Sequence, residues 1–400
     1  MPSALRPQSD LDFTEPEINR DPWPYFEEIR ELGPAVWNPP SNSWILTSYE
    51  DVRAVLRNEA DYAPAAELFA DIFGDPTVLG ADNPRHAELR GIWGPALLRG
   101  AMKSWVDLVA EICDRHLDPA LDRIRDGEVV DLVSHLRMIP TELIARMIGV
   151  PAEDCGLFTE WGQCIVYQFD AYSAPDSEDA AGLREAGIAA TKALNDYCGE
   201  QLEMRRRAGR ADDLLGVMAT TEVPMSDQEK RAYITMFIEG AQDTTTKFNT
   251  TTLAALAQHP EQRTALAKDR EVVPQALEEV MRWQGPVSLD LRIARRPGLQ
   301  IGDVTFAEGD QISPSLAAAN RDPSRWSDPH AFDIFRPAQA HLGFGFGTHS
   351  CMGINLARLV ATTVLNKVLD AIPEYRLATD TLEYGSSFLI RGPLSLPLSR

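Results

Sequence analysis

The sequence lacks any long apolar run. No stretch of about 18 or more apolar residues occurs in its 400 residues, so no membrane-spanning helix is predicted. The opening residues, MPSALRPQSDLDF, lack the apolar stretch of a secretory signal. With 44% hydrophobic and 24% charged residues, the composition is that of an ordinary globular protein. We therefore expect a soluble protein of the cytoplasm.

Basic residues are scarce relative to acidic ones. The chain has 38 Lys and Arg against 60 Asp and Glu, which gives a formal net charge of −22 at pH 7. Binding to nucleic acid depends on basic side chains that neutralise phosphates. The charge balance therefore argues against a nucleic-acid partner, and it favours a partner that docks at a local basic patch.

Cysteine is also rare, and paired cysteine motifs are missing. The five cysteines are Cys113, Cys155, Cys164, Cys198 and Cys351, and none of them forms a C-x-x-C pair or a zinc-type spacing with histidine. A disulfide framework is not expected in a cytosolic chain of this size. Each cysteine is therefore expected to be a small buried hydrophobe unless its neighbours indicate otherwise.

Hydrophobic spacing predicts a mainly α protein with small β-sheets. No repeat or flexible linker divides the chain, so residues 1–400 are predicted to form one large domain. Two short strands around a Pro-Pro turn are expected within residues 35–48, and a helix follows from Tyr49. Longer helices are predicted over residues 102–125, 179–207, 226–259 and 351–371. Between the last two, short strands precede an irregular segment of residues 319–350, whose length is typical of a functional element.

Cys351 has unusual neighbours. It lies in the stretch FGFGTHSCMG, where glycines at 345, 347 and 353 permit sharp turns and a close approach of a flat group. A helix is predicted to begin at Cys351, and a helix N-terminus stabilises a thiolate. A lone thiolate held in this way suits one axial bond to a haem iron. The alternative is a nucleophilic cysteine beside His349, but nothing nearby indicates an oxyanion hole or a third, orienting group.

The same stretch resembles a known family motif. The pattern Phe344-x-x-Gly347-x-His349-x-Cys351-x-Gly353 looks like the haem-binding loop of the cytochrome P450 family. The resemblance implies haem b (iron protoporphyrin IX) as cofactor and Cys351 as its metal ligand. It also implies that Phe344, His349 and Gly353 contact the haem.

A second match lies in the helix predicted over residues 226–259. The stretch EGAQDTTTKF resembles the family's oxygen-activation motif, with Asp243 and Thr244 as the catalytic acid–alcohol pair. Family members often have glycine where Ala241 stands, and Ala241 is expected to lie against the haem. Small residues and a threonine bonded back to the helix can open a groove in it. Taken alone, a threonine-rich surface patch would explain the same residues.

Two further matches support the resemblance. His86 and Arg90 in HAELR share one helix face and resemble residues that contact a haem propionate, as does Arg292. Glu279 and Arg282 in EEVMR resemble a buried ion pair of the family, with Arg336 as its expected third member. The resemblance covers residues 84–398 and implies the P450 fold enclosing a haem.

The resemblance implies a haem-thiolate monooxygenase of the soluble bacterial type. It would take electrons from an iron–sulfur ferredoxin and its reductase, and use O₂ to hydroxylate or O-dealkylate a small hydrophobic or aromatic molecule. It is expected to act as a monomer. Two alternatives stay open at this stage, a haem-thiolate sensor without turnover and a peroxide-driven oxygenase, although the intact acid–alcohol pair argues against both.

Two residue sets follow from family position. The first set is expected to line the substrate pocket: Phe69, Phe73, Phe237, Val287, Leu289 and Phe388. The second set is expected to form the basic patch that a ferredoxin would contact: Arg85, Arg90, Arg99, Lys103, Arg358 and Lys367.

Overall fold

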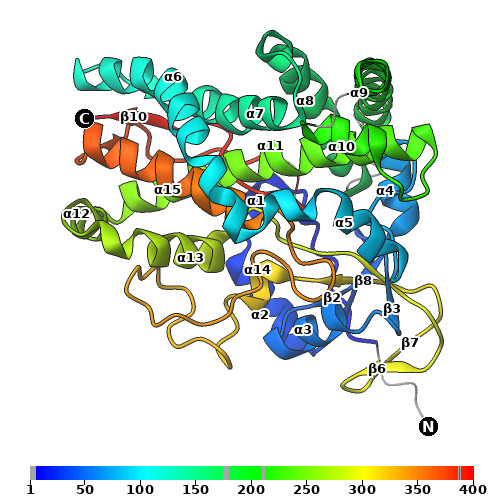
Figure 1. Cartoon of the computed structure of the whole chain (residues 1–400). Coiled ribbons are helices and arrows are strands. Elements are labelled where there is room, and N and C mark those ends of the chain that lie inside the picture. Colours follow the sequence, from blue (N-terminus) through cyan, green and yellow to red (C-terminus); the bar gives the residue numbers. More distant parts are fainter. Residues whose placement is uncertain (1–5, 174–179, 210–211, 386, 388) are drawn as a thin grey trace.

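The computed structural model describes residues 6–173, 180–209, 212–385, 387 and 389–400. It is mainly helical with small β-sheets, so the predicted fold class is confirmed (Figure 1). Helix α11 crosses the upper half of the view with helices both above and below it, and most of the labelled strands lie at the lower right (Figure 1). In the described part of the chain, no helix is both long and apolar enough to cross a bilayer.

The helices follow the predicted order. Those before the central helix are α1 (Pro16–Arg20), α2 (Trp23–Leu32), α3 (Tyr49–Arg57), α4 (Ala66–Phe73), α5 (Arg85–Leu97), η1 (Arg99–Ser104), α6 (Val106–Arg125), α7 (Val133–Ile148), η2 (Ala152–Asp154), α8 (Cys155–Ser173), α9 (Ala180–Ala208) and α10 (Leu214–Thr220). The central helix and those after it are α11 (Asp227–Gln258), α12 (Pro260–Lys268), η3 (Arg270–Val272), α13 (Val273–Gln284), α14 (Leu316–Ala319) and α15 (Ile354–Ala371). The predicted first residue of α9, Asp179, lies outside the described residues.

The strands form three small sheets. The largest has the order β1-β2-β8-β5-β3 and consists of β1 (Val36–Asn38), β2 (Ser43–Leu46), β3 (Tyr62–Pro64), β5 (Arg292–Ala294) and β8 (Gln311–Pro314). The others contain β4 (Val130–Asp131), β9 (Arg376–Leu377) and β10 (Pro397–Ser399), and β6 (Leu299–Ile301) with β7 (Val304–Phe306). The predicted hairpin of β1 and β2 is confirmed, since the two strands pair antiparallel around the Pro-Pro turn.

Helix α11 has the ends that its sequence predicts. The Ser226 side chain accepts a hydrogen bond from the Glu229 N–H, and the Glu229 side chain accepts one from the Ser226 N–H, which forms a capping box. At the other end His259 is the cap, and Pro260 begins the next helix. Most residues between these ends are buried, so the helix is stabilised mainly by packing against its neighbours.

The predicted helix over residues 102–125 is shorter in the structure. A 3₁₀ helix, η1, occupies residues 99–104, and α6 begins only at Val106. Because the Trp105 N–H donates to the carbonyl of Met102, three residues earlier, this turn is tighter than an α-helix. The short turn leaves Leu98, Arg99 and Lys103 exposed.

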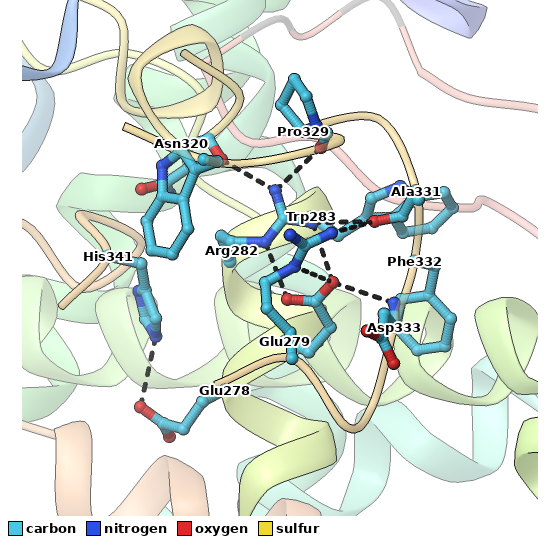
Figure 2. Close-up of polar contacts among 12 residues, drawn as sticks. Glu278, Glu279, Arg282, Trp283, Asn320, Pro329, Ala331, Phe332, Asp333 and His341 are labelled. Carbon is cyan, nitrogen blue, oxygen red and sulfur yellow. Dashed lines mark hydrogen bonds and ion pairs between the residues drawn. The ribbon is translucent and has the colours of Figure 1, made fainter. Parts of the chain in front are cut away.

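A buried ion-pair cluster fixes the irregular segment that leads to Cys351. Arg282 donates from Nε to Glu279 Oε2 at 2.7 Å, and Arg336 donates from Nε to Glu279 Oε1 at 3.1 Å. All three side chains are buried, so the predicted third member is confirmed. The arginines also bond to backbone carbonyls of the segment, among them those of Asn320 and Ala331 (Figure 2). We call Glu279, Arg282 and Arg336 the α13 cluster.

Loss of the α13 carboxylate should destabilise the protein strongly. Glu279→Gln leaves two buried guanidinium groups without their counter-charge, so we expect a loss of about 3–5 kcal/mol of unfolding free energy. The matched control is Glu50→Gln, because Glu50 is 75% exposed and pairs with Arg53 at 3.5 Å. An exposed pair of this kind contributes less than about 1 kcal/mol. Urea unfolding measures both changes, and equal shifts for the two variants would contradict the account.

Candidate cofactor site

The loop before Cys351 closes on itself and packs tightly against its neighbours. The Cys351 N–H donates to the Phe344 carbonyl at 2.8 Å, and Gly345 and Gly347 have φ of 70° and 75°. A Cβ atom on Gly347 would lie 2.7 Å from the Leu56 carbonyl oxygen, and one on Gly343 would lie 2.6 Å from that of Met281. Only glycine fits either position, so the loop is clamped between α3 and α13.

The helix after the loop begins later than the sequence predicted. Helix α15 starts at Ile354, with Gly353 as its cap, and residues 351–353 form a turn instead of a first helical turn. The turn directs the Gly353 N–H at the Cys351 sulfur, which accepts a hydrogen bond from it. Burial raises the pKa of the Cys351 thiol, whereas this hydrogen bond, Arg90 and Arg358 lower it.

Cys351 differs from the other cysteines in its surroundings. Its side chain is exposed by accessible area, although protein atoms surround it densely, as expected for a residue on the wall of an internal space. Cys113, Cys155 and Cys198 are buried, and burial raises their pKa values to about 12, 11 and 12. These three are the buried hydrophobes that were predicted, and Cys164 is half-buried.

Helix α11 presents a narrow accessible strip within an otherwise buried stretch. Over residues 232–256 the residues that are not buried are Gly240, Ala241, Asp243, Thr244 and Lys247, which we call the α11 strip. Three of them are the predicted site residues of this helix. The strip is therefore accessible although the residues around it on the helix are buried.

The acid and the alcohol of the α11 strip have defined partners. Thr244 Oγ1 donates back to the Gly240 carbonyl at 2.7 Å, the back-bonded arrangement expected from the sequence. Asp243 pairs with Lys247 at 2.8 Å, and Lys247 Nζ also donates to the Ile390 carbonyl at 2.8 Å. Lys247 was not among the residues predicted from the sequence, although its i, i+4 spacing from Asp243 is the usual sign of such a pair.

The loop and the strip lie close together. Phe344, at the start of the Cys351 loop, contacts Phe248 edge to face with ring centroids 6.4 Å apart. Phe248 follows Thr244 by one helical turn, so this contact holds the loop next to the strip.

The predicted propionate residues gather around the Cys351 loop. The rings of His86 and His349 lie 4.4 Å apart, and Arg90 donates to the backbone carbonyls of Thr348 and Ser350. Burial first, then His86 and Arg292, lower the pKa of His349 to about 4, so its ring is neutral at pH 7. Its Nε2 is buried and has no hydrogen-bond partner among the described residues. Arg292 pairs with Asp290 close by.

These residues fit a haem better than the alternative of a nucleophilic cysteine. The unpartnered nitrogen of His349 and two nearby arginines are donors for carboxylates, and the exposed thiol of Cys351 suits one axial bond. The described residues contain no cluster of three or more metal-ligating side chains. They also show no hydrogen bond from His349 to Cys351, as a nucleophile and its base would require.

Comparison with known proteins agrees with this geometry. A sequence model of the family described as cytochrome P450 matches residues 157–372. Nocardicin C N-oxygenase of Nocardia uniformis is 30% identical and covers 89% of each chain. The solved structure of P450BioI with an acyl carrier protein bearing hexadec-9Z-enoic acid has a TM-score of 0.86, 26% identity and coverage of 96% and 100%. A Bacillus megaterium cytochrome P450 in complex with testosterone also has a TM-score of 0.86, with 25% identity and coverage of 96% and 98%. The chain therefore belongs to the cytochrome P450 family of haem monooxygenases.

Proposed function

We propose that this P450 takes electrons from an iron–sulfur ferredoxin and oxidises a C–H bond of a hydrophobic substrate at the space between Cys351 and the α11 strip. The single observation that carries the proposal is the accessible strip in the buried central helix, held beside the Cys351 loop by Phe248 and Phe344. When bound, haem activates O₂, and thiolate ligation favours cleavage of the O–O bond. The monomeric state, the single domain and the cytoplasmic location stay predictions.

The chain's own residues would hold the cofactor from two sides. Cys351 supplies the iron ligand, and the Gly353 N–H steadies the charge on its sulfur. Phe344 and Ala241 would contact the haem with an aromatic ring and a small side chain. The propionates would take hydrogen bonds from four side chains that surround the loop: His86, Arg90, Arg292 and His349.

Asp243 and Thr244 are proposed to deliver protons. The Thr244 hydroxyl lies at the accessible strip and donates to the Gly240 carbonyl, so it could turn from that carbonyl and donate a proton at the strip instead. Asp243 is held by Lys247, whose side chain is anchored on the Ile390 carbonyl. When the pair with Lys247 opens, the carboxylate would be free to take up a proton from solvent and pass it toward Thr244.

The substrate is proposed to be hydrophobic. Phe73 and Phe237 are buried, and Phe69, Val287 and Leu289 are half-buried, whereas Phe388 lies outside the described residues. Phe237 packs edge to face on Trp93 at 4.7 Å, so part of its ring belongs to the core. Two solved relatives carry a fatty acyl chain and a steroid. Haem spectral shifts on titration with small aromatics, fatty acids and steroids would separate a small from an extended substrate.

The predicted basic patch is smaller than its sequence implied. Arg85 pairs with Glu88 and Glu229, Arg358 with Glu278, and Lys367 with Asp114 and Asp118. Within the described residues, Arg99 and Lys103 are exposed and form no ion pair. They lie near the start of α15, because Asn355 Nδ2 donates to the Leu97 carbonyl at 3.0 Å. The docking surface is therefore proposed to centre on Leu98, Arg99 and Lys103.

Thr244→Ala tests the proton route. It should leave haem content and reduction nearly unchanged, because neither depends on the hydroxyl, but NADPH should then be consumed with hydrogen peroxide as the main product. Asp243→Asn should instead slow every turnover, since a group that transfers protons contributes about 10²–10⁴-fold. Product, peroxide and NADPH are measured together with a ferredoxin system. A Thr244→Ala enzyme that stays fully coupled would contradict this route, and a wild type without NADPH-dependent turnover would favour the sensor or the peroxide-driven oxygenase.

Arg99→Glu and Lys103→Glu test the docking surface. Both changes should slow reduction by an acidic ferredoxin, and the wild-type rate should fall with added salt, because exposed charges are screened over about 8 Å at physiological ionic strength. The matched control is Lys192→Glu on α9, which makes the same charge change at an exposed lysine. If the ferredoxin reduces all three variants at the same rate, the surface plays no part in docking.

A further inference from the structure

A directed hydrogen-bond chain joins α7 to α11. The Thr141 hydroxyl donates to the Arg137 carbonyl at 2.8 Å, so its oxygen accepts from Gln242 Nε2 at 2.7 Å. This fixes the Gln242 amide with its oxygen on the other side. That oxygen, Oε1, is buried and has no partner among the described residues.

The unpartnered amide oxygen of Gln242 lies near a buried carboxyl group, that of Glu239. A Cβ atom on Gly162 of α8 would lie 2.6 Å from Gln242 Oε1 and 2.9 Å from each carboxyl oxygen of Glu239. Glu239 is 95% buried, as its exposed fraction of 5% indicates, and neither of its oxygens has a described partner. Three oxygens thus converge on the space that the missing side chain of Gly162 leaves.

These three oxygens can form a hydrogen bond with one another only if one of them carries a proton. An ionised Glu239 would place a carboxylate beside an amide oxygen with no donor for either, which is costly in a buried site. A protonated Glu239 can donate its O–H to Gln242 Oε1 and so complete the chain to Thr141 and Arg137. Burial and the nearby charge of Asp243 also raise the pKa of Glu239 well above its ordinary value.

The surrounding charges place the proton on Glu239 and not on Asp243. Asp243 lies one helical turn away on the same face and has Lys247 as its counter-charge at 2.8 Å. On α7, Glu142 is held by Arg115, Arg146 and His116. On α8, Glu160 is exposed. No described cation pairs with Glu239, so its burial without a counter-charge favours the neutral form.

We propose that Glu239 is a neutral carboxylic acid that holds the one proton of the Glu239–Asp243 pair and serves as the proton store behind the Asp243–Thr244 pair. The step is a proton transfer alone: the O–H bond of Glu239 breaks, an O–H bond forms on Asp243, and no electron moves. Asp243 passes this proton on to Thr244, and its carboxylate, on the accessible strip, then takes up a proton from solvent and returns it to Glu239. Glu239 acts through Asp243 and is a positioning residue. The inference rests on the proposed role of Asp243 and Thr244.

Infrared spectroscopy of the purified holoenzyme tests the neutral acid without any turnover. The wild type should show the C=O stretch of a protonated carboxylic acid at pH 7, with a downshift in D₂O. Glu239→Gln should lose this band and keep the fold, because its amide can donate to Gln242 Oε1 in the same way. Glu160→Gln, the control on α8, should keep the band. Asp243→Asn should make the band titrate away at lower pH, because the repelling charge is gone. A wild type without the band, or a band unchanged in Glu239→Gln, would overturn the proposal.

Coupled turnover tests the store itself. Glu239→Gln should form product about tenfold more slowly, less than the loss for a group that touches the oxygen. Its rate should fall more steeply than that of the wild type as pH rises, since solvent alone then supplies protons. If the rate of Glu239→Gln depends on pH in the same way as that of the wild type, Glu239 is not a proton store. If Thr244→Ala produces hydrogen peroxide instead of product in the same experiment, the proposed function stands even when the store is refuted. If Thr244→Ala stays coupled, the proton route through Asp243 and Thr244 is refuted, whatever the infrared band shows.

Discussion

The buried carboxylate of Glu279, shared by Arg282 and Arg336, is the interaction on which the cofactor site depends. These arginines hold the irregular segment on α13 through its backbone carbonyls, and Asn320 of the same segment accepts the Leu342 N–H at 2.7 Å. Gly343 then packs on the backbone of α13, and the Cys351 loop follows. A long segment without regular structure can thus place one sulfur reproducibly, because charge, and not secondary structure, fixes its path.

Helix α11 supplies the other wall, and it combines two opposing requirements. The helix is mostly buried. The proposed chemistry nevertheless needs an acid and a hydroxyl on an accessible strip of the same helix. Small residues at 240 and 241 open the strip, and Lys247 neutralises Asp243 on the same face. Glu239, Asp243 and Lys247 follow one another at intervals of four residues and comprise two carboxyl groups and one cation. Their charges cancel when one of the two carboxyl groups stays protonated.

Much of this was predictable from the sequence, and the exceptions have physical reasons. The ends of α11 follow from local signals, the Ser226–Glu229 box and Pro260, and the Cys351 loop follows from its glycines. The late start of α15 was missed because nothing in residues 351–353 marks the turn that they form before the helix begins at Ile354. The ion pairs that neutralise Arg358 and Lys367 join distant parts of the chain, which spacing does not reveal. Glu239 looks like an ordinary helical acid until α7 and α8 enclose it.

The central claim is that Cys351 supplies the ligand of the haem iron. The carbonyl spectrum of the reduced holoenzyme tests it most directly, because a thiolate ligand shifts that spectrum strongly to the red. The wild type and Cys164→Ala, which removes a half-buried thiol elsewhere, should both show the red-shifted band. Cys351→Ser should bind haem through the same surrounding residues but lose the band, since a hydroxyl is a poor ligand here. A Cys351→Ser protein that keeps the red-shifted band would contradict the account.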